Sequence, residues 1–202
     1  MKDLKFIHIT KTAGTSIENE ANKLNIQWGR FHKEYGWWHE IFKHKSVELK
    51  EMYDWFMVVR NPYDRMLSEF HCIWGGIGGS SGSPQITNQR IEMSSKETFN
   101  NFLISRIKNC YLRVWHANGV LGDHYTPQYE YLDVNNKIHI LKMENLDEDF
   151  QSLMDQYKLP VKLNSKDNVT SKKFTIDDMN PQLKDLIKRT YERDFELFGY
   201  KL

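Results

Sequence analysis

Residues 4–16 read Leu4-Lys5-Phe6-Ile7-His8-Ile9-Thr10-Lys11-Thr12-Ala13-Gly14-Thr15-Ser16. An apolar-rich run stops at a stretch of hydroxyl side chains with one lysine and one glycine, and helix formers follow from Ile17 to Leu24. This order predicts a strand, a tight turn and the N-terminus of a helix. At such a helix start, backbone N–H groups, hydroxyls and a lysine favour binding of a phosphate or sulfate, and an ordinary capped turn is the alternative.

The turn differs from the Walker A loop of kinases and ATPases. A Walker A loop places its lysine between a glycine and the hydroxyl residue. Here Lys11 comes before Gly14, so the lysine would reach an anion from the strand side. We expect Gly14 to permit the turn and to let an anion approach the backbone.

Two more strand-and-helix units follow along the chain. Residues 54–60 are almost uninterrupted in apolar character, as in a buried parallel strand, and Asn61-Pro62 then starts a helix that runs through Phe70. Residues 137–143 predict a third strand, which a helix from about residue 146 to residue 157 follows. Three such units predict an α/β domain with a parallel sheet.

The remaining segments predict further helices and one loop. Asn180-Pro181 is typical of a helix start, and Gly199 of a helix end. Apolar residues between positions 99 and 110 share one helical face. Residues 75–84 are rich in glycine and serine and predict a flexible loop, which could act as a lid over a ligand. We expect all of these elements to form a single domain over residues 1–202.

A second candidate anion site follows the second strand. Arg60 comes at the carboxyl end of that strand, where open α/β sheets bind their ligands. Ser68, on the helix that follows, can lean back toward the same place. A guanidinium fork and a hydroxyl suit a terminal phosphate monoester. Two anion sites on strands of one sheet indicate a ligand with two separate charged ends.

Several segments in order resemble those of sulfotransferases that use 3′-phosphoadenosine-5′-phosphosulfate (PAPS). Residues 6–16 resemble their 5′-phosphosulfate loop, and residues 58–70 are similar to their 3′-phosphate motif. Three further segments resemble the carbohydrate, Golgi-type branch of the family: His124–Gln128, Lys142–Phe150 and Tyr191–Tyr200. The resemblance implies a P-loop-like three-layer sandwich, with a central parallel sheet flanked by helices. Golgi members of that branch carry an N-terminal membrane anchor and a longer chain. This sequence shows neither feature, so we expect it to be a short, soluble member.

The resemblance also implies roles for the residues of both anion motifs. Lys11 would stabilise the oxygen that bridges sulfur and phosphorus, as a catalytic and a donor-binding residue. Arg60 and Ser68 would bind the 3′-phosphate. The 5′-phosphate would lie against Thr12, Ala13, Gly14, Thr15 and Ser16. PAPS would be the co-substrate and 3′,5′-bisphosphate adenosine (PAP) the product, with no metal required because cationic and N–H donors take its place.

Histidine is the residue type best suited to act as the general base near neutral pH. His39 is our candidate, because related sulfotransferases place a histidine shortly before the Arg-x-Pro block and His39 precedes Arg60 by 21 residues. His32, His44 and His124 are the alternatives. A second role is open to His124, which would line the acceptor pocket.

The residues beside His39 suggest how an acceptor could be held. Trp37 and Trp38 could form an aromatic wall for an acceptor, or they could belong to the core. The branch resemblance favours a carbohydrate hydroxyl as acceptor over another small-molecule alcohol.

Composition narrows the class of partner. The chain has 28 Lys and Arg against 27 Asp and Glu, a net charge of +1, which excludes a broadly basic surface for nucleic acid or anionic membranes. No secretion signal or long apolar stretch is present, so we expect a cytoplasmic protein. Cys72 and Cys110 are too few for a disulfide framework or zinc site, and we expect two reduced thiols.

Two other functions remain open at this stage. A P-loop-type kinase shares the strand–loop–helix arrangement, although the Walker A lysine is missing here. A non-catalytic PAP-binding module would keep the fold and the nucleotide site without turnover.

Overall fold

The computed structural model describes residues 2–29, 34–35, 39–79, 82–109, 124–133, 135–164 and 173–201. The chain divides into two compact units, each built from two stretches of sequence. The first unit contains Met1–Arg60 and Val114–Asp167, and the second contains Asn61–Arg113 and Asn168–Leu202. That the two act as one domain over residues 1–202 stays a prediction.

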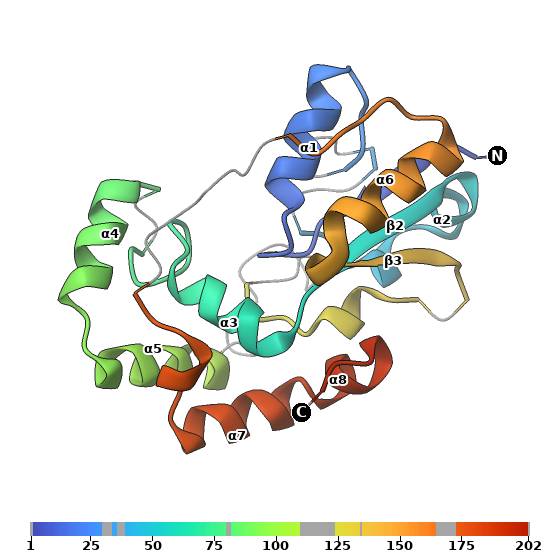
Figure 1. The fold of residues 1–202 in the computed structure, drawn as a ribbon. Helices are drawn as coiled ribbons and strands as arrows, with labels where there is room; N and C mark the ends of the chain where they lie inside the picture. Colours follow the sequence, from blue (N-terminus) through green and yellow to red (C-terminus); the bar gives the residue numbers. More distant parts are fainter. Residues whose placement is uncertain are drawn as a thin grey trace. The chain divides into compact units, whose positions relative to one another are not determined.

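The first unit contains a parallel sheet in the order β1-β2-β3 (Figure 1). The register pairs Phe6 of β1 with Phe56 of β2, and Phe56 with His139 of β3. The strands are β1 (Leu4–Ile7), β2 (Asp54–Val59) and β3 (Ile138–Lys142). All three coincide with runs of apolar sequence, and their parallel pairing confirms the predicted α/β fold.

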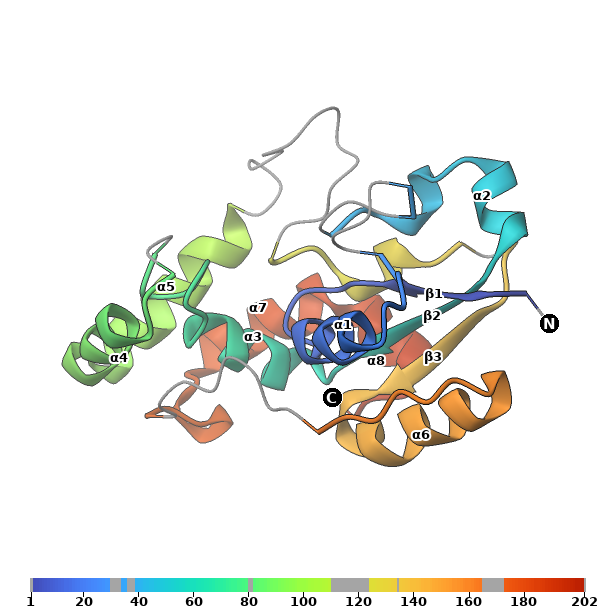
Figure 2. The same cartoon turned by 90° about the horizontal axis from the view of Figure 1, so that it is seen from above.

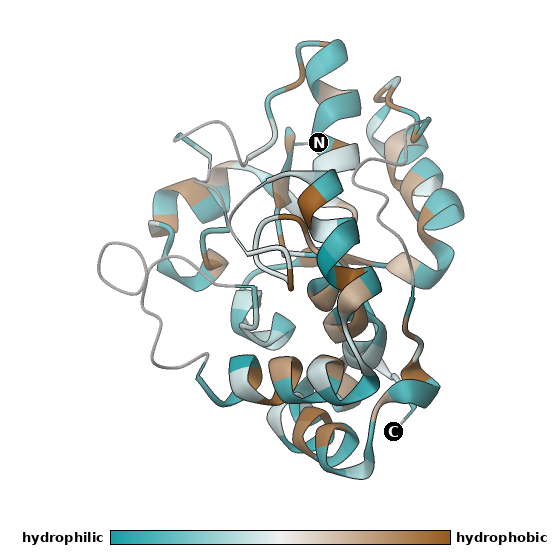
Figure 3. Ribbon diagram, turned by 90° about the vertical axis from the view of Figure 1, so that its left-hand side faces the viewer, coloured by the Kyte–Doolittle hydropathy of each residue, from teal (hydrophilic) through white to brown (hydrophobic). Residues whose placement is uncertain are grey.

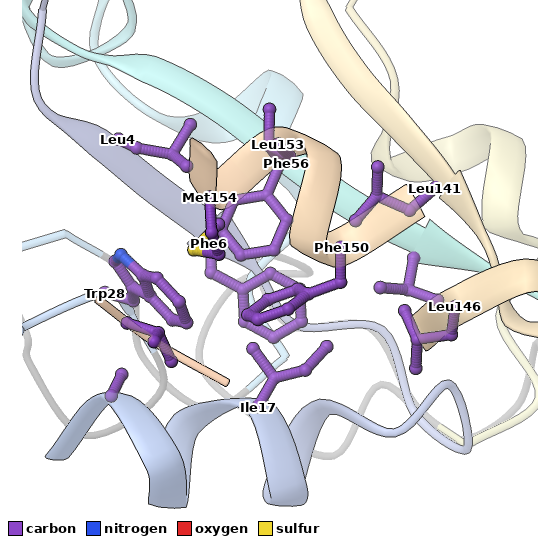
Figure 4. Close-up of a cluster of buried hydrophobic side chains, with 13 residues drawn as sticks. Leu4, Phe6, Ile17, Trp28, Phe56, Leu141, Leu146, Phe150, Leu153 and Met154 are labelled. Carbon is purple, nitrogen blue, oxygen red and sulfur yellow. The ribbon is translucent and has the colours of Figure 1, made fainter. Parts of the chain in front are cut away.

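One face of this sheet is covered by α1 (Gly14–Lys23) and α6 (Leu146–Tyr157). Figure 2 shows α6 lying along the strands. The sheet and the two helices bury a common cluster (Figure 4): Leu4, Phe6, Ile17, Ala21, Trp28, Phe56, Val58, Leu141, Leu146, Phe150, Leu153, Met154 and Val161. The predicted third helix, residues 146–157, is confirmed at both ends.

The opposite face carries short elements. Trp55 of β2 packs edge-to-face on Phe42, with ring centroids 5.1 Å apart, and its indole N–H donates to the Lys50 carbonyl at 3.2 Å. These contacts hold two elements on this face: η1 (Phe42–His44) and α2 (Val47–Met52). Two further 3₁₀ turns, η4 (Gln128–Tyr131) and η5 (Met143–Asn145), flank β3 in sequence.

The second unit is helical in the part of the chain that is described. Its elements are α3 (Pro62–Phe70), α4 (Pro84–Met93), α5 (Lys96–Lys108), η6 (Ile176–Asp178), α7 (Pro181–Thr190) and α8 (Glu192–Phe198). Phe99 packs against Phe70 and Phe174 with centroid distances of 4.9 and 4.8 Å. Figure 3 shows hydrophilic and hydrophobic residues alternating along the helices, as expected where one face is buried.

Local sequence signals explain where these helices start and stop. Pro62, Pro84 and Pro181 each begin a helix, and the residue before each proline accepts a backbone N–H of the first turn. Gly199 ends α8 at φ 64°, a left-handed conformation that glycine adopts without strain. The predicted helix starts at Asn61-Pro62 and Asn180-Pro181 are therefore confirmed.

Three features differ from the sequence prediction. The single C-terminal helix is broken at Tyr191, which is fully buried and whose hydroxyl donates to the Met66 sulfur at 3.3 Å. The helices α2 and α4 were not predicted, because α2 buries no residue and α4 buries only Thr87 and Ile91. An apolar stripe of helical period was therefore absent from both.

Two further observations concern the chain as a whole. Cys72 is buried and is not part of a disulfide among the described residues, whereas Cys110 lies outside them. Across the described ranges, none of the helices has the length and apolar character needed to cross a membrane.

Candidate active site

The loop between β1 and α1 has an unusual backbone. Lys11 and Ala13 both adopt left-handed conformations, at φ 61° and φ 63°. For residues other than glycine this costs about 1–2 kcal/mol each. Left-handed residues that alternate with right-handed ones turn successive N–H groups toward a common point, and this arrangement binds anions. Strain of this kind persists where the surroundings enforce it, and it concentrates at ligand sites.

The side chains of the loop divide into two groups. The fully buried Thr12 hydroxyl donates to the Ile9 carbonyl at 3.0 Å, so this side chain stabilises the turn itself and only its backbone N–H can serve an anion. The half-buried Lys11 ammonium has no hydrogen bond or ion pair with any residue that the structure describes. Thr15 is half-buried and Ser16 buried, both in the first turn of α1. The loop therefore offers N–H groups, one cation and the hydroxyls of the first helical turn.

Gly14 has a packing role that the sequence did not predict. The left-handed residues of the loop are Lys11 and Ala13, whereas Gly14 already belongs to α1. That Gly14 lets an anion approach the backbone stays a prediction. A Cβ added at Gly14 would lie only 2.3 Å from Nε2 of His8. Glycine is required here because the His8 ring occupies the space, and this packing could not be read from the turn sequence.

His39 lies at the carboxyl end of β1. Its Nδ1 is 3.1 Å from the backbone oxygen of His8. A carbonyl oxygen can only accept, so Nδ1 carries the proton and Nε2 is the basic nitrogen of the neutral ring. The ring is half-buried and packs edge-on against the His8 ring, with centroids 4.8 Å apart.

The structure places His124 beside His39. Their ring centroids are 5.9 Å apart, and the Thr10 hydroxyl donates to the His124 carbonyl at 3.3 Å. His8, His39 and His124 therefore gather next to the loop of residues 10–16. His44 is exposed at the end of η1. The remaining sequence candidates, His32, Trp37 and Trp38, lie outside the described residues.

An ion pair follows His39 in the chain. Glu40 pairs with Lys45, whose side chain is almost fully buried. Burial lowers the pKa of Lys45, and the Glu40 carboxylate opposes that shift. The pair fixes the chain directly after His39, because a buried charge is expensive to separate from its partner.

Arg60 is held by a residue that the sequence did not single out. The fully buried Gln128 accepts the Arg60 backbone N–H at 2.9 Å and donates its own amide to the Arg60 carbonyl at 2.9 Å. The guanidinium in turn donates to the Lys11 carbonyl at 3.4 Å, so the two motifs meet. Sequence reasoning included Gln128 only in the His124–Gln128 segment, since no periodic pattern marks an amide in a turn.

Ser68 cannot be joined to this group. It is half-buried on α3 in the second unit, whereas Arg60 belongs to the first unit, at the end of its first stretch of sequence. The shared phosphate contact of Arg60 and Ser68 stays a prediction.

Comparison with known proteins supplies the remaining finding. The model of the sulfotransferase family matches residues 2–201, nearly the entire chain and both compact units. No curated protein and no solved structure matched. Members of this family take their sulfuryl group from PAPS. The chain thus belongs to the sulfotransferase family and is a transferase of sulfuryl groups.

Proposed function

We propose that this sulfotransferase transfers the sulfuryl group of PAPS to an acceptor hydroxyl in line, with His39 as general base. The observation that carries the proposal is the hydrogen bond from His39 Nδ1 to the His8 carbonyl, 3.1 Å long. It holds the neutral ring in the tautomer with a basic Nε2, beside a loop whose backbone suits an anion.

The donor set of the loop fits a bisphosphate nucleotide. In the proposal, Lys11 and the N–H groups from Thr12 to Ser16 bind the 5′-phosphosulfate. Arg60 binds the 3′-phosphate, with Ser68 as its second contact. The guanidinium already lies against the Lys11 carbonyl, which supports a single ligand spanning both motifs. These groups are cationic or N–H donors, which stabilise negative charge that develops on a phosphate.

In the proposed step, the acceptor oxygen forms a bond to sulfur while its proton passes to His39 Nε2. The bond between sulfur and the bridging oxygen breaks, and PAP leaves with the electron pair. Lys11 stabilises the charge on that oxygen, so the transfer requires no metal ion.

A carbohydrate hydroxyl is the proposed acceptor. His124 lies in the segment that resembles the carbohydrate branch, and its ring faces His39 at 5.9 Å. We assign His124 to the acceptor pocket and His39 to the base, because His39 has the fixed tautomer. Trp37 and Trp38 are proposed as the aromatic side of the same pocket.

Substitution of His39 tests the proposal. With labelled PAPS and a panel of carbohydrate and alcohol acceptors, His39→Ala should lower turnover by about 10²- to 10⁴-fold, the usual contribution of a general base. PAP affinity measured by calorimetry should stay at the wild-type value. His44→Ala, at an exposed histidine, is the matched control and should behave as wild type. Near-normal turnover in His39→Ala would remove His39 from the mechanism.

Chelation separates this proposal from a kinase. Sulfuryl transfer should continue in excess EDTA, because the donors are protein groups. Loss of activity in EDTA together with phosphoryl transfer from ATP would instead indicate a P-loop-type kinase. Binding of PAP without turnover on any acceptor would indicate a non-catalytic module.

A further inference from the structure

We propose that Glu18 is a positioning residue for His39, acting through His8. The inference rests on the proposed function, in which His39 is the base. It concerns a buried acidic side chain to which neither the sequence nor the proposed mechanism gives a role.

Glu18 and His8 form a buried pair directly behind the loop. Glu18 is on α1, with its side chain 2% exposed, and its Oε1 lies 3.4 Å from Nδ1 of His8, whose side chain is 4% exposed. A buried carboxylate is costly unless it is hydrogen-bonded. The contact with Glu18 therefore restricts the orientation of the His8 ring.

The orientation of His8 matters to two parts of the site. Its ring fills the space that Gly14 leaves open, 2.3 Å from where a Cβ would stand. The ring also contacts the ring of His39, and the backbone carbonyl of His8 accepts a hydrogen bond from His39 Nδ1. A change in the orientation of the His8 ring therefore reaches His39 through the contact of the two rings, which helps to hold His39 Nδ1 toward that carbonyl.

Stability alone does not account for the pair. Replacing both members of a buried ionic or polar pair with apolar groups of similar volume is often neutral or stabilising, whereas removing one member alone destabilises the protein. Methionine would fill the volume of Glu18 and leave the buried Nδ1 of His8 without its acceptor, so Glu18→Met should lose some stability. A positioning role predicts in addition that the folded variant has an altered His39 tautomer and lower turnover, which a loss of stability alone would not cause.

The test compares two substitutions at position 18. Glu18→Met keeps the volume and loses the bond to His8, whereas Glu18→Gln keeps a polar atom that can bond to Nδ1. The matched control is Glu20→Met, because Glu20 is also a buried glutamate of α1 but pairs with Lys23 at 2.9 Å.

Two readouts are needed. Long-range ¹H–¹⁵N NMR, with His39→Ala for assignment, reports which His39 nitrogen carries the proton. Release of sulfate from labelled PAPS, with water as the acceptor, reports turnover. We expect Glu18→Met to shift the tautomer toward a mixture and to lower turnover about 10- to 100-fold, as is typical for loss of a supporting hydrogen bond. PAP affinity should not fall, the unfolding midpoint of Glu18→Met should fall because His8 Nδ1 loses its acceptor, and Glu18→Gln and Glu20→Met should resemble wild type.

Other outcomes overturn the inference. A wild-type tautomer and turnover in Glu18→Met would show that the pair does not position His39. Equal loss in Glu18→Met and Glu18→Gln would assign the effect to charge rather than to position. If Glu18→Met fails to fold, Glu18→Gln provides the test, because it keeps the bond to His8 and should keep the wild-type tautomer. An altered His39 tautomer in a Glu18→Gln protein with a wild-type unfolding midpoint would contradict the proposal. The tautomer is measured without any turnover, so failure of the proposed function through His39→Ala remains a separate result.

Discussion

Gly14 shows how a single missing methyl group shapes the candidate site. The residue lies against the His8 ring, and the conformational strain of the turn falls on Lys11 and Ala13 instead. The His8 carbonyl also accepts the hydrogen bond from His39. His8 therefore links the packing at Gly14 to the orientation of the His39 ring.

A double substitution tests that connection. Gly14→Ala should destabilise the protein by about 1–3 kcal/mol, the usual cost of overpacking. In Gly14→Ala combined with His8→Ala, the collision is gone, so the two losses should not add. Urea unfolding of the four proteins in this cycle measures the coupling. Strictly additive losses would contradict the contact.

The sequence predicted the loop residues and the position of the candidate base, because those signals are local or come from motif spacing. It did not predict that the loop has left-handed residues other than glycine, that Gly14 accommodates His8, or that Gln128 holds Arg60. These features depend on contacts between segments far apart in the chain. No pattern within one segment contains them.

Among the elements, three are joined by one polar network. The Tyr157 hydroxyl at the end of α6 donates to Asp54 at the start of β2 at 2.8 Å, and lies 2.8 Å from Nε2 of His139 in β3. The hydroxyl proton goes to Asp54, so His139 donates its Nε2 proton to the phenol oxygen. Burial lowers the pKa of His139 below its ordinary 6.5, and the positive charge of Lys137 lowers it further. The negative charge of the Asp54 carboxylate opposes this shift.

The network predicts a loss of stability in mild acid. Since the pKa of His139 is lower in the folded chain, the unfolded chain binds more protons and stability falls as the pH drops below about 6.5. Urea midpoints of wild type should therefore fall between about pH 7.5 and about pH 5.5. His139→Gln should show a smaller decrease over the same range. An identical decrease in both proteins would place the pH dependence elsewhere.

Helix starts were predicted wherever a cap and a proline stand together, as at Asn61-Pro62 and Asn180-Pro181. The same signal at Ser83-Pro84 was assigned to the end of a glycine- and serine-rich loop, and α4 was missed. Caps depend on neighbouring residues only, whereas the break at Tyr191 depends on burial of its ring. The sequence next to a helix therefore predicts where the helix starts better than it predicts whether the helix is interrupted.

At the scale of the whole molecule, the first of the three points at which the chain passes between the two compact units falls within the Arg60-Asn61-Pro62 motif. The family match crosses that boundary and covers residues 2–201. The near-neutral net charge of +1 gave no sign of an anion site, because the cations that matter are few and placed by the fold. The order of motifs predicted the family, whereas a carbohydrate acceptor stays a prediction.

Nucleotide binding should stabilise the whole chain. A ligand that binds only the folded state adds about 2.7 kcal/mol at a hundred times its Kd, which for a protein of this size raises Tm by several degrees. We expect PAP to raise Tm of wild type in this way and to raise that of Arg60→Ala less at the same concentration. Equal shifts would remove Arg60 from the nucleotide site.

The bond from His39 to the His8 backbone has a consequence for how such an enzyme can diversify. A carbonyl is present whatever side chain occupies its position, so substitutions in the proposed acceptor pocket leave the hydrogen-bond acceptor of His39 Nδ1 in place. Under the proposed function, new specificities would arise by changing neighbouring side chains while His39 keeps its protonation geometry. Selection or directed evolution for a different alcohol would best begin at His124 and the residues around it, with His39 left unchanged.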